Sequence, residues 1–312
     1  MIIVLHGKDT FRTDRKLKEI VAGYKKKNKT GINITHLPEK PSFIDLRDSS
    51  RQMGMFEEKR LLIGKNVLKN KELKKEIEKR LDELVSGDNI LILKEDRKIK
   101  GKLVKKIEKL EKDQGLIQEF DRLEGRKLKS WYKVEFSKYD VDLKRGVIDK
   151  MVEFVGDDLW RAKNEINKLS LMNLGGEVSV RDVTENVRPD FNVDIFKTVE
   201  ALARGDKGAA LEMIEKHIKN GDSVFYILSM INYQIRNLLI VKELEEKGLR
   251  GKEAKSKSKL HPYAFKKTKA QSGSFSFNQL KKIHRKLSKV DLDSKLGRIS
   301  PETGIMLVIS QF

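Results

Sequence analysis

The sequence predicts an α/β domain built on a mostly parallel sheet, followed by helical domains that continue to the last residue. Short apolar runs alternate with helical patterns in the first 120 residues, and no convincing strand pattern follows Gly125. The net positive charge is concentrated in the last fifth of the 312-residue chain, where acidic residues are few. Strands that alternate with helical segments favour parallel pairing, because a parallel connection needs a crossover helix to return along the sheet.

Alternating strand and helix patterns define the first domain, which we expect at residues 1–124. The strand candidates are Ile2–Leu5, Asn33–Leu37, Arg60–Val67, Asn89–Leu93 and Leu116–Phe120. The helical patterns are Phe11–Lys27, Lys71–Val85 and Lys102–Leu110. The first helical pattern has apolar residues at helical spacing, namely Leu17, Ile20, Val21 and Tyr24.

Helical patterns alone fill the rest of the chain, and we expect two domains there, at residues 125–190 and 191–312. The break between them falls at Arg188-Pro189-Asp190, a turn signal. A long apolar helix is expected to begin after Asp222 or Ser223 and to end at Gly248. Further helices are predicted from Ser276, and from Ser300-Pro301, where proline takes the first helical position.

The formal net charge of +20 favours a polyanionic partner such as nucleic acid. From Arg250 to Phe312, fifteen Lys and Arg residues stand against four acidic ones, so over half of the excess charge lies in a fifth of the chain. Such concentration is what a phosphate-facing surface needs. The alternative is that a lysine-rich composition serves solubility alone.

Cysteine is absent from the sequence, which excludes disulfides, Cys-ligated zinc and thiol catalysis, and fits a reducing compartment. The N-terminus is apolar for only four residues after Met1 and has no basic leader, so a first strand is expected there rather than a signal peptide. Eighteen apolar residues never run together, so no membrane span is expected. These features predict a soluble, cytoplasmic protein.

The loop after the first strand resembles a phosphate-binding loop only in part. A P-loop needs G-x-x-x-x-G-K-[ST], in which backbone amides and the lysine hold phosphate and the hydroxyl holds magnesium. Here Gly7 and Lys8 are present, but Ile2 stands in place of the first glycine and Asp9 in place of the hydroxyl. Because an aspartate there repels phosphate, we expect this chain not to hydrolyse ATP.

A search for other chemistry gives no catalytic residue, no metal ligand and no cofactor site. The five histidines are scattered without H-E-x-x-H spacing, which favours surface or packing roles. Glu57-Glu58 and Asp157-Asp158 lie beside basic residues, and no serine occupies a G-x-S-x-G elbow. The sequence therefore favours a binding protein over an enzyme.

Four strings, in order along the chain, resemble the delta subunit family of bacterial DNA polymerase III clamp loaders. They are Met53–Ile63, with its apolar pair before a basic residue and a strand; Val155–Arg161, continuing to Asn164-Glu165 and Lys168-Leu169; Phe196 with Arg204–Asp206 and Ala210-Leu211; and His261–Lys267 with Asp291 and Lys295–Gly297. Met55 stands where leucine is common in the family. Lys252–Lys259 departs from its pattern, with only Ala254 as an apolar residue, and we expect a solvated loop there.

The resemblance implies an AAA+-like fold without a P-loop: an α/β domain, a three-helix lid and a helical collar. It also implies a subunit that binds the ring-shaped sliding clamp and holds one ring interface open, while partner subunits hydrolyse ATP. The expected partners are the sliding clamp, the other clamp-loader subunits and primed DNA. The long helix Val224–Leu244 would then serve partly as a surface for other subunits.

By the same resemblance, Met55 and Phe56 are the clamp-binding pair, because two large apolar side chains displayed together can fill a hydrophobic groove. The alternative is that they pack with Met53 under the next strand. Lys266, Lys267 and Lys269 follow a proline at a helix start and are the expected DNA-binding residues. The alternative function is a stand-alone basic protein that binds nucleic acid without partners.

Overall fold

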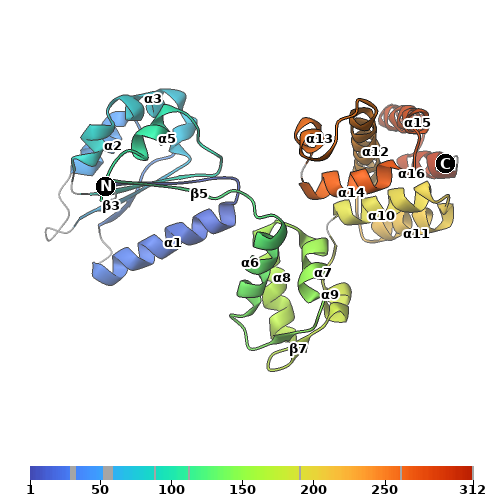
Figure 1. Cartoon of the computed structure of the whole chain (residues 1–312), viewed down its shortest axis with the longest axis horizontal. Coiled ribbons are helices and arrows are strands. Elements are labelled where there is room, and N and C mark those ends of the chain that lie inside the picture. The colour runs from blue at the N-terminus through green and yellow to red at the C-terminus, as the bar shows by residue number, and fades with distance from the viewer. Residues whose placement is uncertain are drawn as a thin grey trace. The chain divides into compact units, whose positions relative to one another are not determined.

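The computed structural model describes residues 1–28, 33–51, 59–87, 89–111, 113–189, 191–260 and 262–310 (Figure 1). The chain divides into two compact units. The first comprises Met1–Trp131 and Asp157–Asn164, and the second comprises Tyr132–Gly156 and Glu165–Phe312. The three-domain division with boundaries at residues 124 and 190 stays a prediction.

A five-stranded parallel sheet forms the centre of the first unit, in the order β2-β3-β4-β1-β5. Its strands are β1 (Ile2–His6), β2 (Ile34–His36), β3 (Leu61–Lys65), β4 (Ile90–Glu95) and β5 (Gly115–Glu119). β1 pairs with a strand on each side, and its Ile2 lies opposite Leu91 of β4 and Gly115 of β5. The predicted parallel α/β sheet is therefore confirmed.

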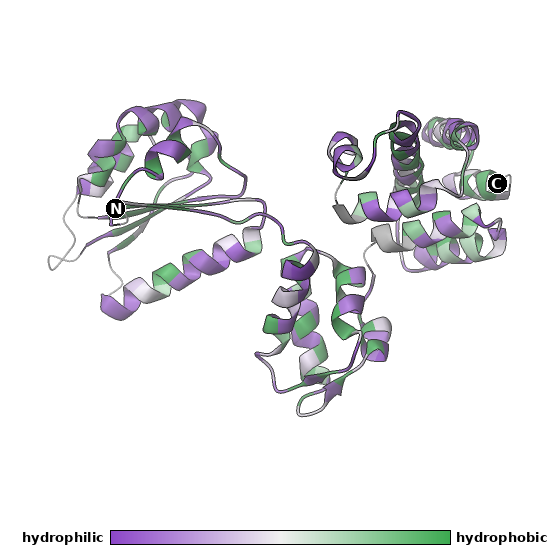
Figure 2. Ribbon diagram, in the orientation of Figure 1, coloured by the Kyte–Doolittle hydropathy of each residue, from purple (hydrophilic) through white to green (hydrophobic). Residues whose placement is uncertain are grey.

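Helices cover both faces of this sheet: α1 (Thr10–Lys27) lies on one face, and α2 (Phe43–Arg51), α3 (Lys71–Lys79) and α5 (Lys102–Ile107) lie on the other (Figure 1). The short elements η2 (Val67–Lys69) and α4 (Leu81–Val85) complete that second layer. Neighbouring residues of β1 point to opposite faces, so Ile3 packs with the α1 residue Leu17, whereas Ile2 packs in the other core. Figure 2 shows hydrophilic and hydrophobic residues interleaved along α1, as expected for a helix with one buried face.

The helix α2 has no counterpart among the sequence predictions. Its buried apolar residues are Phe43 and Leu46 alone, three residues apart, which is too little for a periodic pattern. Ser42 caps it through a reciprocal arrangement: the Ser42 hydroxyl accepts from the amide of Asp45, and the Asp45 carboxylate accepts from the amide of Ser42. The capping and the two core contacts together fix the helix.

The middle of the chain holds α6 (Gly125–Phe136), α7 (Val147–Val155), α8 (Leu159–Met172) and α9 (Val180–Asn186), as predicted for a helical region. It also holds a two-stranded parallel ladder that the sequence did not predict, formed by β6 (Asp142–Leu143) and β7 (Glu177–Val178). Each of these strands has only two residues, so no alternation of apolar and polar residues can mark them.

The C-terminal part is all helical and has its own large core. Its helices are α10 (Phe191–Ala203), α11 (Lys207–Lys219), α12 (Val224–Glu246), α13 (Gly251–Ser258), α14 (Pro262–Ser272), α15 (Phe277–Lys295) and α16 (Pro301–Ser310). The core draws residues from α10, α11, α12, α15 and α16. The predicted start of α15 at Ser276 is confirmed, because Ser276 and Gln279 form a capping box.

The helix α12 is long and apolar enough to cross a membrane by length and composition alone, and it is the one such helix in the described part of the chain. Half of its apolar window is buried inside the protein. Its buried side chains include Gln234, whose amide donates to the Gln271 side-chain oxygen of α14 at 2.9 Å. Burial against neighbouring helices and a satisfied internal amide are features of a core helix.

The expected loop at Lys252–Lys259 is wrong, because this stretch forms the helix α13. Ala254 and Ser258, four residues apart, are both buried on the same face of the helix. Ala254 packs with Val241 of α12 and Phe265 of α14. Two small residues are enough for a helix to approach its neighbours closely, and a search for large apolar residues does not detect such a face.

Candidate functional site

The loop between β1 and α1, where a nucleotide-binding protein would hold phosphate, is closed by the chain's own groups. Gly7 has a φ of +144°, and a Cβ added to it would overlap the Phe120 carbonyl oxygen. Asp9 caps α1, with its carboxylate accepting from the backbone amide of Arg12 at 2.9 Å and from the Arg12 Nε at 2.6 Å. The negative group at the N-terminus of α1 is therefore the Asp9 carboxylate of the protein itself, at the position where a phosphate would bind in a nucleotide-binding protein.

The same helix end carries an aromatic cluster. The ring of Phe11 meets the rings of Trp131 and Trp160 edge-on, with centroid separations of 5.6 and 5.1 Å. The Trp160 indole nitrogen donates to the Thr10 hydroxyl at 2.9 Å. Trp160 belongs to the second string of the family resemblance, and the structure places it against the residues that follow Asp9. Phe11 was not singled out in the sequence, because nothing in its local pattern distinguishes it from a core residue.

Charged residues fill the carboxyl edge of the sheet, where ligands bind in many α/β proteins. The Lys94 Nζ lies 2.7 Å from the Asp14 carboxylate and 2.8 Å from that of Asp96. The Asn66 side chain donates to Asp96 at 2.6 Å. Burial by itself lowers the pKa of Lys94, but the hydrogen bonds to Asp14 and Asp96 outweigh it and hold the pKa above its usual value. Lys94 is therefore a charged structural group.

Next to it, Glu95 is fully buried. One carboxylate oxygen accepts from the backbone amide of Leu68 at 2.7 Å, and the other has no hydrogen-bond partner among the residues that the structure describes. Burial raises the pKa of Glu95 above its usual value, although the Leu68 amide and the charges of Arg97 and Lys69 act in the opposite direction. Folding thus shifts the protonation equilibrium of Glu95 toward the neutral carboxyl.

This burial predicts a pH-dependent stability change. A carboxyl whose pKa is raised by folding destabilises the protein increasingly as the pH rises above the usual carboxyl range, because the folded state must then bury the charge. A Glu95→Gln variant should therefore be more stable than the wild type, by a margin that widens from about pH 4 to about pH 7. Thermal unfolding across this range measures the margin, with the exposed Glu111→Gln as control; a margin that stays constant would contradict the prediction.

The expected clamp-binding residues, Met55 and Phe56, lie in residues 52–58, which fall outside the described residues. The structure does describe both flanks of this segment: α2 ends at Arg51 and β3 begins at Leu61. The segment thus joins an outer helix to a strand next to the sheet edge. That Met55 and Phe56 are displayed on the surface for clamp binding stays a prediction.

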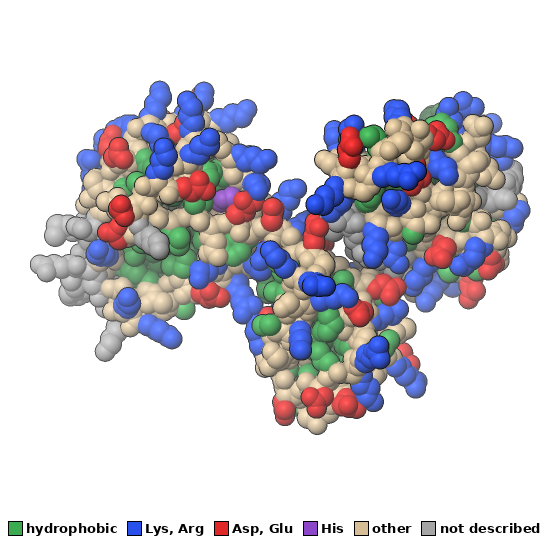
Figure 3. Space-filling model, viewed as in Figure 1, with side chains coloured by type: hydrophobic (Ala, Val, Ile, Leu, Met, Phe, Trp, Pro, Cys, Tyr) green, Lys and Arg blue, Asp and Glu red, His purple; other side chains and the backbone are tan. Residues whose placement is uncertain are grey.

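The expected DNA-binding residues lie on the outer face of α14. Lys266, Lys267 and Lys269 are all exposed, whereas Thr268 and Gln271 of the same helix are buried. The Gln271 amide donates to the Phe196 carbonyl of α10 at 2.7 Å, which fixes the helix on the core. Figure 3 shows Lys and Arg side chains outnumbering Asp and Glu on the visible face of the C-terminal helices. The structure therefore places the three lysines on the exposed side of one helix.

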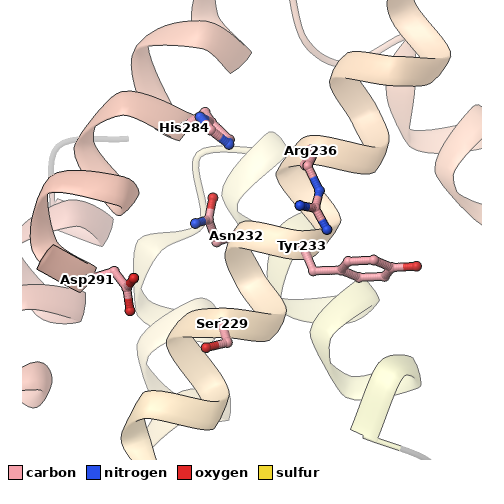
Figure 4. Close-up of a pocket in the computed structure, with 6 residues that line it drawn as sticks. All are labelled: Ser229, Asn232, Tyr233, Arg236, His284 and Asp291. Atoms are coloured by element: carbon pink, nitrogen blue, oxygen red, sulfur yellow. The ribbon is translucent and has the colours of Figure 1, made fainter. Parts of the chain in front are cut away.

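A small pocket of about 140 Å³ lies between α12 and α15 (Figure 4). It is lined by Ser229, Asn232, Tyr233 and Arg236 of α12, and by His284 and Asp291 of α15. The Asp291 carboxylate is paired with Lys295 at 2.6 Å, and the Arg236 guanidinium lies 5.5 Å from the Tyr233 ring centroid. These groups were not predicted as a site, because they come together only when two helices far apart in the sequence pack.

Known proteins match this chain both in sequence and in fold. Residues 192–312 match the model of the DNA polymerase III delta subunit, C-terminal domain. The DNA polymerase III subunit delta of Bacillus subtilis (strain 168) is 24% identical over 164 residues, which are 52% of this chain and 47% of that protein. The chain thus aligns with about half the length of this curated relative.

The structure of the Bacillus subtilis DNA clamp loader delta protein is similar over 99% of this chain and 94% of its own, with a TM-score of 0.72 and 20% identity. The fold is accordingly that of a clamp-loader delta protein: a parallel α/β sheet followed by helical regions. The resemblance to the delta subunit family that the four strings indicated is confirmed.

Proposed function

We propose that this protein is the delta subunit of a bacterial clamp loader, which binds the sliding clamp and holds one ring interface open for loading onto primed DNA. The observation that carries the proposal is the family match of residues 192–312, together with a delta-type fold over nearly the whole chain. Its partners are the clamp, the other loader subunits and primed DNA, and it acts in the cytoplasm.

In this proposal the subunit does not hydrolyse ATP, and its partners do. The arrangement at the N-terminus of α1 supports this part, since Asp9 and Arg12 form an ion pair there and Gly7 lies against the Phe120 backbone. A phosphate would meet the Asp9 carboxylate at that helix end and be repelled. The residues 1–124 would form the clamp-binding domain, 125–190 the lid and 191–312 the collar that contacts other subunits.

Binding of the purified protein to the sliding clamp of the same organism, without ATP, tests the proposal. We expect a sub-micromolar complex, because a subunit that needs no nucleotide of its own should bind the clamp alone. No detectable binding, accompanied by salt-sensitive binding to any duplex, would favour the stand-alone nucleic-acid-binding protein instead.

Primed DNA would be contacted by the exposed lysines of α14. Reversing the charge of Lys266, Lys267 and Lys269 to glutamate should weaken binding of the assembled loader to DNA. It should also flatten the slope of log affinity against log salt by about 0.9 for each phosphate that the loader no longer neutralises. The matched control reverses Lys282, Arg285 and Lys289, which are exposed on α15 of the same core and change the net charge equally. If the two triple variants weaken DNA binding equally, the effect comes from the overall charge of the protein, and the lysines of α14 make no specific contact with DNA.

A further inference from the structure

Asn89 is a buried side chain with an unusual pair of partners. It is 7% exposed and lies immediately before β4. Its side-chain amide nitrogen donates to the Ser50 carbonyl oxygen at 2.7 Å, and its side-chain oxygen accepts from the Arg60 backbone amide at 2.7 Å. One planar side chain thus joins two backbone groups that are ten residues apart in the sequence.

Those two backbone groups bracket the segment 52–58. Ser50 lies in the last turn of α2, and Arg60 immediately precedes β3. The side-chain amide of Asn89 therefore holds the two flanks of this segment at a fixed separation, like a clip. In general, a loop whose two anchor points are held in place loses less conformational entropy when it binds a partner.

The clip is itself fixed by the sheet. The N-terminal amine of Met1 donates to the Asn89 carbonyl oxygen at 2.9 Å, and the Ile90 amide donates to the Arg60 carbonyl at 2.8 Å. Gly87 passes so close to α2 that an added Cβ would lie 2.9 Å from the Ser50 carbonyl oxygen. Because Asn89 directly precedes β4, its two side-chain hydrogen bonds tie both flanks of the segment to that strand.

We infer that Asn89 is a positioning residue, which sets the segment carrying Met55 and Phe56 for binding to the clamp. This inference rests on the proposed function, because the clamp is the partner that the segment is positioned for. Asn89 itself touches backbone groups and acts through them. The same two hydrogen bonds predict a second, clamp-independent property: the segment's ends are protected from proteases while the clip is intact.

The test uses Asn89→Asp in the full chain. Aspartate has the same shape and still accepts from the Arg60 amide, but it cannot donate to Ser50 and sets a carboxylate oxygen against the Ser50 carbonyl. The matched control is Asn66→Asp: Asn66 likewise makes two side-chain hydrogen bonds in the same unit, donating to Asp96 at 2.6 Å and accepting from its amide at 3.1 Å, away from the segment. Both variants are compared with the wild type in clamp affinity and in tryptic cleavage after Arg51, Lys59 and Arg60.

We expect Asn89→Asp to weaken clamp binding at least tenfold and to speed cleavage at the three flanking sites, while Asn66→Asp stays within about twofold of wild type in both. Wild-type affinity and wild-type cleavage in Asn89→Asp would overturn the inference, and so would equal effects of the two variants. If Asn89→Asp does not fold, Gly87→Ala replaces it, since its methyl group presses on the Ser50 carbonyl. If the wild type binds no clamp, the proposed function fails, and cleavage alone then decides whether Asn89 holds the segment.

Discussion

A variant with serine in place of both Met55 and Phe56 is expected to lose clamp binding while remaining folded. Burying a large apolar side chain contributes about 1.5–3 kcal/mol, so removing both should cost on the order of 3–6 kcal/mol of binding free energy. This corresponds to at least about a hundredfold loss of affinity, since about 1.4 kcal/mol is a factor of ten. Surface-immobilised clamp and purified protein give the dissociation constants directly.

The matched control is Leu116→Ser. Leu116 is 42% exposed on β5, at the opposite sheet edge from β2 and β3, so it tests the general effect of removing an exposed apolar side chain from the same unit. Thermal unfolding of all variants separates the two interpretations of the pair. If the double variant binds normally but is markedly less stable, Met55 and Phe56 pack under the following strand instead of contacting the clamp.

Replacing Gly7 with alanine is expected to destabilise the first unit severely. The φ of +144° at Gly7 costs a residue with a side chain about 1–3 kcal/mol. The added methyl group would overlap the Phe120 carbonyl, a backbone group that cannot rotate away. The β1–α1 loop would have to move off β5, and the total loss should exceed about 3 kcal/mol.

Replacing Gly23 with alanine is expected to have the opposite effect on the stability of the same unit. It lies exposed within α1, and an added Cβ would meet nothing within 4 Å, so Gly23→Ala should stabilise the unit by about 0.5–1 kcal/mol. Urea unfolding followed by tryptophan fluorescence measures both, since the two tryptophans, Trp131 and Trp160, lie against Phe11 in the first unit. Equal stability of Gly7→Ala and wild type would mean that the loop is not held against Phe120.

The sequence predicted the elements with a clear period and clear end signals. The strands of the sheet and the long helices α1, α12 and α15 carry enough apolar residues at regular spacing to identify themselves, and Ser276 marks its helix start through a local capping box. It also indicated Lys266, Lys267 and Lys269 together, because they closely follow a proline that marks a helix start.

The elements that the sequence missed depend on contacts from elsewhere in the chain. The helix α2 is held by two core residues, and α13 by Ala254 and Ser258 against Val241 and Phe265, so neither carries a strong pattern of its own. Their helical state results from the neighbours that bury them. Tertiary packing commonly overrides weak local preference in this way.

The sequence by itself determined the parallel α/β sheet, the helical C-terminal region, the concentration of positive charge and the delta-family resemblance. Each of these depends on the spacing or the composition of residues along the chain. The tertiary structure decided which polar groups meet. The contacts of Asn89 with Ser50 and Arg60, and of Phe11 with Trp131 and Trp160, join residues tens of positions or more apart. No local sequence feature identifies an asparagine that bridges two segments in this way. Its partners are a backbone carbonyl and a backbone amide, groups that almost every residue has, and only the fold brings these two within reach.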